Sequence, residues 1–212
     1  MTTTKPKWRE VMLNEDSLYN ILTNPQEEKT LFLMIKQMDL TAIRMYKLTG
    51  ILEHKENWPK LASLIEKLRA AGIIYIAAQR SSYFRHVEDE ETGTIAFNTS
   101  CASDLQRFNV LGIEGEPWQT DRTKEGYVAY KLWMDDIKKT NKYCQQNGLT
   151  NDVYVHKFLD TTTNTATSVI AHDLAYYNKR VNLTCYINTT KLITKGRAWT
   201  EMLNRLILLG TQ

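Results

Sequence analysis

The segment from Asn57 to Gln79 constrains the fold of this chain more than any other. In its first part, apolar residues recur at helical spacing, which is the pattern of one buried helical face. These residues are Leu61, Leu64, Ile65 and Leu68. Gly72 follows at the point where a left-handed C-terminal cap favours a residue without a Cβ atom. Residues 73–76 then change to β-branched and aromatic types, which favour a strand. The segment therefore predicts a helix, a glycine stop and a short apolar strand.

The composition excludes several classes of protein. The chain has 212 residues, of which 42% are hydrophobic and 24% charged, as in an ordinary globular protein. This length allows one large domain or two small ones. A membrane-spanning helix needs a run of roughly 18 or more apolar residues, and the sequence contains none. Residues 1–10 carry positive charge with no apolar segment after it, so we expect no secretory signal and a cytoplasmic protein.

The cysteines and the charge add two further expectations. Cys101, Cys144 and Cys185 are far apart and form no CxxC pair, so we expect thiols in a reducing compartment. No phosphate-binding loop, dinucleotide motif or metal-binding motif is present, and we assign neither cofactor nor metal. The net charge of +3 is below the strongly basic balance that indicates nucleic-acid binding by itself. Any such function has to come from local clusters of basic residues.

The order of the expected elements divides the chain. Residues 1–24 are expected to form a basic arm and a short helix, and Pro25 begins a second helix that ends near Met38. Asp39 is a candidate cap for a third, shorter helix over residues 41–48. After the strand that follows Gly72, residues 83–98 alternate weakly around an acidic turn, which predicts a β-hairpin.

The second half of the chain is expected to be helical or mixed. Residues 109–123 contain two glycines and a proline and are the candidate domain boundary. Residues 124–146 form the longest helical pattern, with a wide aromatic face that suits a core or a homodimer seam. We expect a second domain over residues 124–212. Its other expected elements are a helix at 169–177, a strand at 183–187 and a helix at 199–209.

The elements of residues 25–98 resemble the winged helix-turn-helix superfamily. The resemblance is carried by residues 40–52, the helix at 59–72, the strand at 73–77 and the hairpin at 83–98. It implies an α+β, helix-rich fold with a winged-helix-like domain over residues 25–108 and a helical or mixed C-terminal part. In that family the third helix enters the major groove of DNA, and the hairpin forms a wing that contacts the backbone.

The resemblance implies a DNA interface on the helix at 58–71 and on the wing. Asparagine pairs with adenine, and lysine and arginine reach guanine or phosphate. The residues expected to bind nucleic acid are Asn57, Lys60, Ser63, Lys67, Arg80 and Arg85. Lys5, Lys7 and Arg9 of the arm would add non-specific affinity. The function expected from this resemblance is binding of double-stranded DNA in transcriptional control or replication initiation.

Two other interpretations stay open. The expected hairpin tip, Glu88 to Glu91, is acidic and would be repelled by phosphate, so the fold is also suited to a protein–protein adaptor or inhibitor with a basic partner. A helix that leads through a glycine into a buried strand is equally typical of an α/β unit. A small intracellular hydrolase is therefore the third interpretation. None of the four histidines, His54, His86, His156 and His172, belongs to a catalytic or metal-binding motif, and we assign no catalytic residue.

Overall fold

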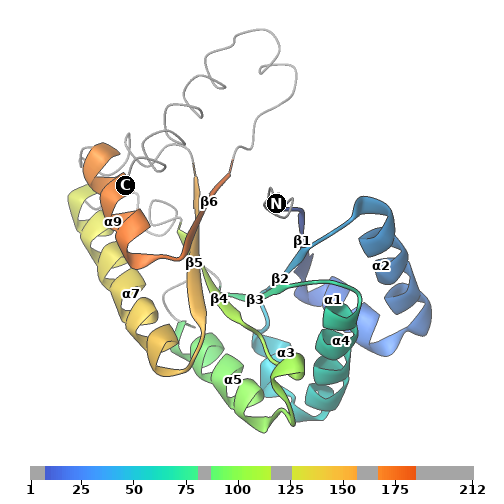
Figure 1. Cartoon of the computed structure of the whole chain (residues 1–212). Helices are drawn as coiled ribbons and strands as arrows, with labels where there is room; N and C mark the ends of the chain where they lie inside the picture. The colour runs from blue at the N-terminus through green and yellow to red at the C-terminus, as the bar shows by residue number, and fades with distance from the viewer. Residues whose placement is uncertain (1–7, 81–86, 116–125, 157–166, 185–212) are drawn as a thin grey trace, which may run out of the picture. The chain divides into compact units, whose positions relative to one another are not determined.

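The structure is a computed structural model that describes residues 8–80, 87–115, 126–156 and 167–184 (Figure 1). Strands and helices alternate along most of the described chain. The strands are β1 (Glu10–Asn14), β2 (Ala42–Tyr46), β3 (Tyr75–Arg80), β4 (Val110–Gly115), β5 (Thr150–His156) and β6 (Arg180–Thr184). The helices are α1 (Glu15–Thr23), α2 (Pro25–Met38), α3 (Thr49–Glu53), α4 (Trp58–Ala70), α5 (Val87–Ser100), α7 (Gly126–Gln146) and α9 (Thr167–Tyr177). Short 3₁₀ helices are η1 (Lys55–Asn57) and η2 (Asp104–Gln106).

The strands form one hydrogen-bonded sheet in their order along the chain, β1-β2-β3-β4-β5-β6. The pairs β1–β2, β2–β3 and β5–β6 are parallel. Parallel neighbours need a crossover connection, and the intervening helices provide it. The protein is therefore an α/β fold. The expected α+β class and the resemblance to the winged helix-turn-helix superfamily are both wrong.

Two elements account for this error. Residues 41–48 were expected to be a helix, but residues 42–46 form strand β2. Residues 83–98 were expected to form the wing, but from Val87 onward they belong to helix α5. Since residues 42–46 form a strand and the described part of the expected wing is a helix, the winged-helix basis for DNA binding and transcription regulation is lost.

Strand β2 was difficult to recognise because both of its faces are covered. Its first four residues, from Ala42 to Met45, are all buried. A strand buried on both faces shows no alternation of polar and apolar residues. Helix α5 was difficult for another reason: it places Glu90 and Glu91 in the interior, at 4% and 3% exposure. Buried acidic residues remove the amphipathic pattern by which a helix is recognised.

Other expectations are confirmed. Helix α4 covers residues 58–70, and its four periodic apolar residues are buried, each exposed by 2% or less. Gly72 has φ +94°, as a left-handed position requires. Helix α2 begins at Pro25 after Asn24, whose side chain accepts a hydrogen bond from the amide of Gln26. The long helix α7 spans residues 126–146.

Several predictions fall on residues that the structure does not describe. They are the basic residues Lys5 and Lys7, Arg85, Cys185 and the helix at 199–209. Within the described ranges, no helix is long and apolar enough to cross a membrane.

The chain divides into two compact units, residues 1–111 and 112–212. In the first unit, alternation along the strands gives the sheet two different faces. Leu13, Ile43 and Ile76 lie on one face and are buried. Helices α1 and α4 lie together on one side of β1–β3 (Figure 1). This apolar face and the apolar sides of the helices make the core of the unit.

The second unit has a core of its own. Trp133 and Ile137 of α7 pack with Val153 and Val155 of β5, and Ile170 of α9 joins them. Beside this core, the amide groups of three asparagines form a hydrogen-bonded network with the end of α9. Asn151 Nδ2 donates to Asn178 Oδ1 at 2.9 Å, and Asn141 donates to the carbonyl of Tyr177. The network connects α7, β5 and the segment before β6, so it has a structural role.

Candidate functional site

A polar group lies on the second face of β1–β3. Glu10, Arg44 and Gln79 share this face, because each lies an even number of registered positions from the others. Arg44 Nε donates to Glu10 Oε1 at 2.7 Å, and Arg44 Nη1 donates to Gln79 Oε1. The guanidinium is 1% exposed, whereas the Glu10 side chain is 18% exposed. A buried charge is tolerated when it is paired and hydrogen-bonded, and Arg44 satisfies both conditions.

A second polar group lies at the end of β3 and on the following helix. Arg80 Nη1 is 2.6 Å from Glu91 Oε1 of α5, and both side chains are buried. The neighbouring Glu90 accepts a hydrogen bond from the Thr49 hydroxyl at 2.9 Å. Helix α5 is therefore held to β3 and to the start of α3 by buried carboxylates. These contacts fix the backbone around the carboxyl ends of β2 and β3.

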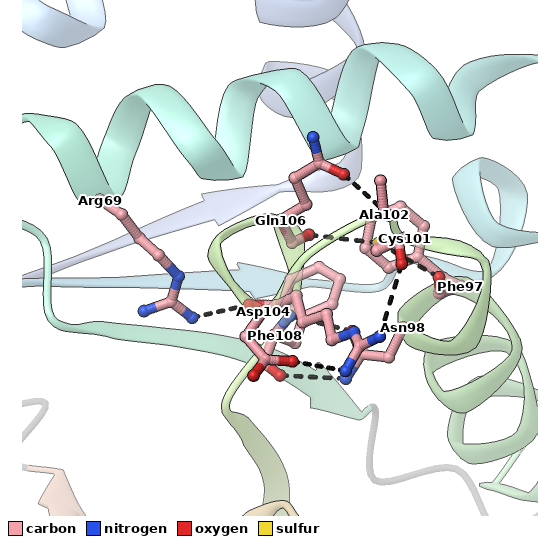
Figure 2. Close-up of polar contacts among 9 residues, drawn as sticks. Arg69, Phe97, Asn98, Cys101, Ala102, Asp104, Gln106 and Phe108 are labelled. Atoms are coloured by element: carbon pink, nitrogen blue, oxygen red, sulfur yellow. Dashed lines mark hydrogen bonds and ion pairs between the residues drawn. The ribbon is translucent and has the colours of Figure 1, made fainter.

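The loop between α5 and β4 forms a hydrogen-bonded cluster at the opposite end of these strands (Figure 2). Arg69 of α4 donates to the carbonyl of Arg107 at 2.7 Å, and Arg107 contacts Asp104 at 2.5 Å. Asn98 of α5 accepts from the amide of Phe108 at 2.9 Å and donates to its carbonyl at 3.0 Å. Every one of these bonds joins groups of the same loop or its supporting helices.

The cluster contains Cys101, whose thiol contacts the carbonyl oxygens of Phe97 and Gln106 at 3.3 and 3.4 Å. Burial raises the pKa of this thiol, and Arg107 lowers it by less. A raised pKa makes a thiol a poor nucleophile. Burial also lowers the pKa of Arg69, with an opposing effect from Asp104. Because polar groups at the amino ends of parallel strands typically stabilise the fold, we interpret this cluster as structural.

In parallel α/β folds, ligand sites are formed by the segments at the carboxyl ends of the strands. A pocket of about 300 Å³ lies there, formed by residues that come shortly after β1 and β2. Its lining carries carboxylate, imidazole, phenol and amide groups. The lining residues are Glu15, Asp16, Tyr19, Asn20, Gly50, Ile51, His54 and Asn57. The pocket therefore collects groups capable of acid–base chemistry and hydrogen bonding at the end of the sheet that ligands use.

Local structure positions these side chains. Asn14 caps α1 by accepting a hydrogen bond from the amide of Ser17 at 2.9 Å, so that Glu15 and Asp16 begin the helix directly after β1. Glu15 Oε1 in turn accepts from the amide of Ile51 at 3.2 Å. This bond connects the start of α1 to α3. The Glu15 carboxylate is therefore part of the pocket wall.

His54 lies between α3 and η1 and contacts a carboxylate two residues later. Its Nδ1 is 3.1 Å from Glu56 Oε1. A backbone hydrogen bond at Glu56 lowers the pKa of its carboxyl group; desolvation opposes this effect, and the contact with His54 adds to it. An ionised carboxylate only accepts hydrogen bonds, so the Nδ1–H of His54 donates to it. In the neutral ring the lone pair then lies on Nε2.

The structure separates the residues predicted to bind nucleic acid. Lys60 and Ser63 are exposed on α4, and Lys67 is half-exposed but contacts Glu28 of α2 at 2.6 Å. Asn57 lines the pocket, whereas Arg80 is buried against Glu91. Contact of these residues with DNA stays a prediction. The acidic run also differs from a solvated tip, because Glu90 and Glu91 are buried.

Sequence reasoning missed the residues of the pocket other than Asn57. Glu15 and Asp16 appear in the sequence as ordinary acidic residues at the start of a helix, and His54 belongs to no motif. The available signal was the order of elements: residues just after two parallel strands meet at one edge of a sheet. That signal required β1 and β2 to be recognised as strands.

The fold and the pocket define the chain as an α/β protein with a small polar pocket at the carboxyl ends of its first strands. Its sequence matches no known protein-family model and no curated protein.

Proposed function

We propose that this chain is a small-molecule hydrolase in which His54 is the general base of the pocket formed by α1, α3 and η1. The observation that carries the proposal is the hydrogen bond between His54 Nδ1 and Glu56, at the edge of a cavity where an α/β fold binds its ligands. Histidine is the side chain best suited to exchanging protons near neutral pH. A carboxylate that holds Nδ1 keeps the basic Nε2 in a defined orientation.

The proposed reaction is the hydrolysis of an ester. A water molecule attacks the carbonyl carbon, and its proton passes to Nε2 of His54. The tetrahedral intermediate then collapses, the bond between carbon and the leaving oxygen breaks, and His54 returns the proton to that oxygen. Hydrogen-bond donors in the same lining, the Asn20 and Asn57 amides and the Tyr19 hydroxyl, are suited to stabilising the negative charge on the intermediate.

The test uses p-nitrophenyl acetate as a general ester probe. We expect the purified chain to release p-nitrophenolate and His54→Gln to lower the protein-dependent rate by at least about tenfold, since general base catalysis typically contributes more than this. Circular dichroism shows whether each variant is folded. His54 is exposed, so its replacement leaves the core intact.

The second unit provides a matched control. His172 is 62% exposed and its Nδ1 lies 3.5 Å from Asp173, so it reproduces the exposure and the neighbouring carboxylate without the pocket lining. His172→Gln is expected to retain the wild-type rate. Equal rates in the wild type, His54→Gln and His172→Gln would contradict the proposal, because His54 would then contribute no more than a histidine outside the pocket.

A further inference from the structure

The lining of the pocket is acidic. Glu15 and Asp16 contribute two carboxylates, and among the described residues that form the lining there is no lysine or arginine. Lys47 and Lys55 are close in sequence to the lining residues of α3 and η1, but each lies over an aromatic ring instead. Lys47 Nζ is 5.2 Å from the centre of the Tyr46 ring, and Lys55 Nζ is 5.5 Å from the centre of the Trp58 ring. The two carboxylates therefore favour a ligand with a positive charge, and the negative charge of the proposed intermediate depends on the uncharged donors Tyr19, Asn20 and Asn57.

One of the two carboxylates is built into the wall. Glu15 Oε1 accepts the amide hydrogen of Ile51, and it also occupies the space beside Gly50. A Cβ atom at Gly50 would lie 2.8 Å from Glu15 Oε1, closer than real Cβ contacts. The glycine thus leaves room for the carboxylate. A carboxylate whose position is fixed before binding loses little entropy when a ligand binds.

The remaining groups of the lining suit the same kind of ligand. The Tyr19 ring is 52% exposed and is able to contact a cation through its face. The side chains of Asn20 and Asn57 offer carbonyl oxygens, which accept hydrogen bonds from an ammonium group. A volume of about 300 Å³ is at the lower end of the range for ligand pockets. The ligand that fits these properties is small, positively charged and partly aromatic or aliphatic.

We infer that the pocket binds a small organic cation with a primary ammonium group, which Glu15 and Asp16 recognise through their charge. The inference rests on the proposed function in that the same pocket would hold the substrate of the hydrolase. It adds the class of that substrate: an ester that carries an ammonium group. Recognition of the ammonium group requires only the carboxylates, and hydrolysis requires His54 as well.

The test compares three probes that share one ring and differ in charge: benzylamine, benzyl alcohol and benzoate. Each is titrated into the ¹⁵N-labelled chain at low salt and followed by chemical-shift changes of the backbone amides. We expect benzylamine to shift the amides of residues 15–20 and 50–57 in a saturable way, with weaker effects of benzyl alcohol and none of benzoate. Added salt should weaken the binding, since the pocket is open to solvent.

Two variants and one control identify the groups responsible. Glu15→Gln and Asp16→Asn retain the size of the side chain and an oxygen acceptor, and each is expected to weaken benzylamine binding by about tenfold, the effect of one nearby charge at a protein surface. Glu27→Gln removes an exposed acidic residue of the first turn of α2 and is expected to leave the binding unchanged. This control separates local recognition from the effect of net charge.

The outcomes distinguish this inference from the proposed hydrolase. Saturable benzylamine binding that the two variants weaken supports the inference, whether or not His54→Gln changes ester hydrolysis. Benzoate binding as strong as benzylamine binding would overturn it, as would benzylamine binding that is equal in the wild type and in Glu15→Gln. Hydrolysis that depends on His54 without any benzylamine binding would support the enzyme and exclude this substrate class.

Discussion

Arg80 Nη1 at the end of β3 lies 2.6 Å from Glu91 Oε1 of α5, and the two side chains are 2% and 4% exposed. Removing one partner of a buried ion pair leaves a charge in the interior. We therefore expect Glu91→Ala to lower the free energy of unfolding by about 3–5 kcal/mol. Urea denaturation followed by circular dichroism measures this change.

A second ion pair in the same unit is the control for this prediction. Lys67 Nζ lies 2.6 Å from Glu28 Oε1, an equal distance, but the two side chains are 50% and 30% exposed. Water screens this pair, and Glu28→Ala is expected to cost less than about 1 kcal/mol. Equal losses in the two variants would show that burial does not determine the strength of the Arg80–Glu91 pair.

The sequence was sufficient for elements whose own pattern determines them. Helix α4 was predicted because its apolar residues repeat every three or four positions and Gly72 ends it. The end of α4 and the start of the following strand depend on residues that are adjacent in the sequence, so the local pattern was enough to predict both. Helix α2 was predicted in the same way, because Asn24 caps it and Pro25 is its first residue.

The sequence was not sufficient where tertiary contacts decide the structure. Strand β2 reads AIRMY and contains an arginine that would normally mark a solvated face. Arg44 is buried in β2 because Glu10 and Gln79, from strands far away in the sequence, satisfy its guanidinium. Likewise, Arg80 provides the partner that allows Glu91 into the interior. Neither arrangement is visible before the strands are paired, and the pocket depends on the same pairing.

The glycine that ends α4 gives a prediction about the backbone alone. Gly72 has φ +94°, and a Cβ atom built on it meets nothing within 4 Å. Gly72→Ala therefore causes no clash, and its cost is the backbone strain of about 1–2 kcal/mol for an L-residue in the left-handed region. Asparagine tolerates this region better, so Gly72→Asn should cost less than Gly72→Ala in thermal denaturation. A larger loss for asparagine would contradict this explanation.

The thiol of Cys101 gives a prediction about pH. Its pKa is raised in the folded state, mainly by burial, and the thiolate is the reactive form. At pH 8 we expect iodoacetamide to modify Cys101 at least about tenfold more slowly than free cysteine, because its side chain is also poorly accessible. The unfolded chain loses this proton at lower pH, so folding stability falls as the pH rises from the unfolded pKa through the folded one. Mass spectrometry of the Cys101 peptide measures the modification; a rate equal to that of free cysteine would contradict the prediction.

The carboxyl group of Glu56 provides a test of the contact with His54. Its pKa is lowered first by a backbone hydrogen bond at Glu56 and to a smaller extent by His54. Carbon-13 NMR should therefore show Glu56 titrating below the usual range for glutamate, and His54→Ala should recover a minor part of the shift. A lowered folded pKa adds stability above the unfolded pKa, which is lost as the pH falls through the folded value. A midpoint at the usual glutamate value would show that neither the backbone hydrogen bond nor the contact with His54 stabilises the ionised carboxylate of Glu56 in solution.

Gly50 tests whether the wall of the pocket sets its affinity. An added Cβ atom would lie 2.8 Å from Glu15 Oε1, so Gly50→Ala has to displace the carboxylate, which is the movable end of a side chain. The displacement would break its hydrogen bond with the amide of Ile51 without removing any charge. We expect Gly50→Ala to weaken benzylamine binding by about threefold to tenfold, part of the effect of one nearby charge, and to shift the amide resonance of Ile51. If that resonance moves and the binding does not, the charge of Glu15 attracts the ammonium group without precise positioning. If neither changes, the carboxylate does not occupy the wall in solution.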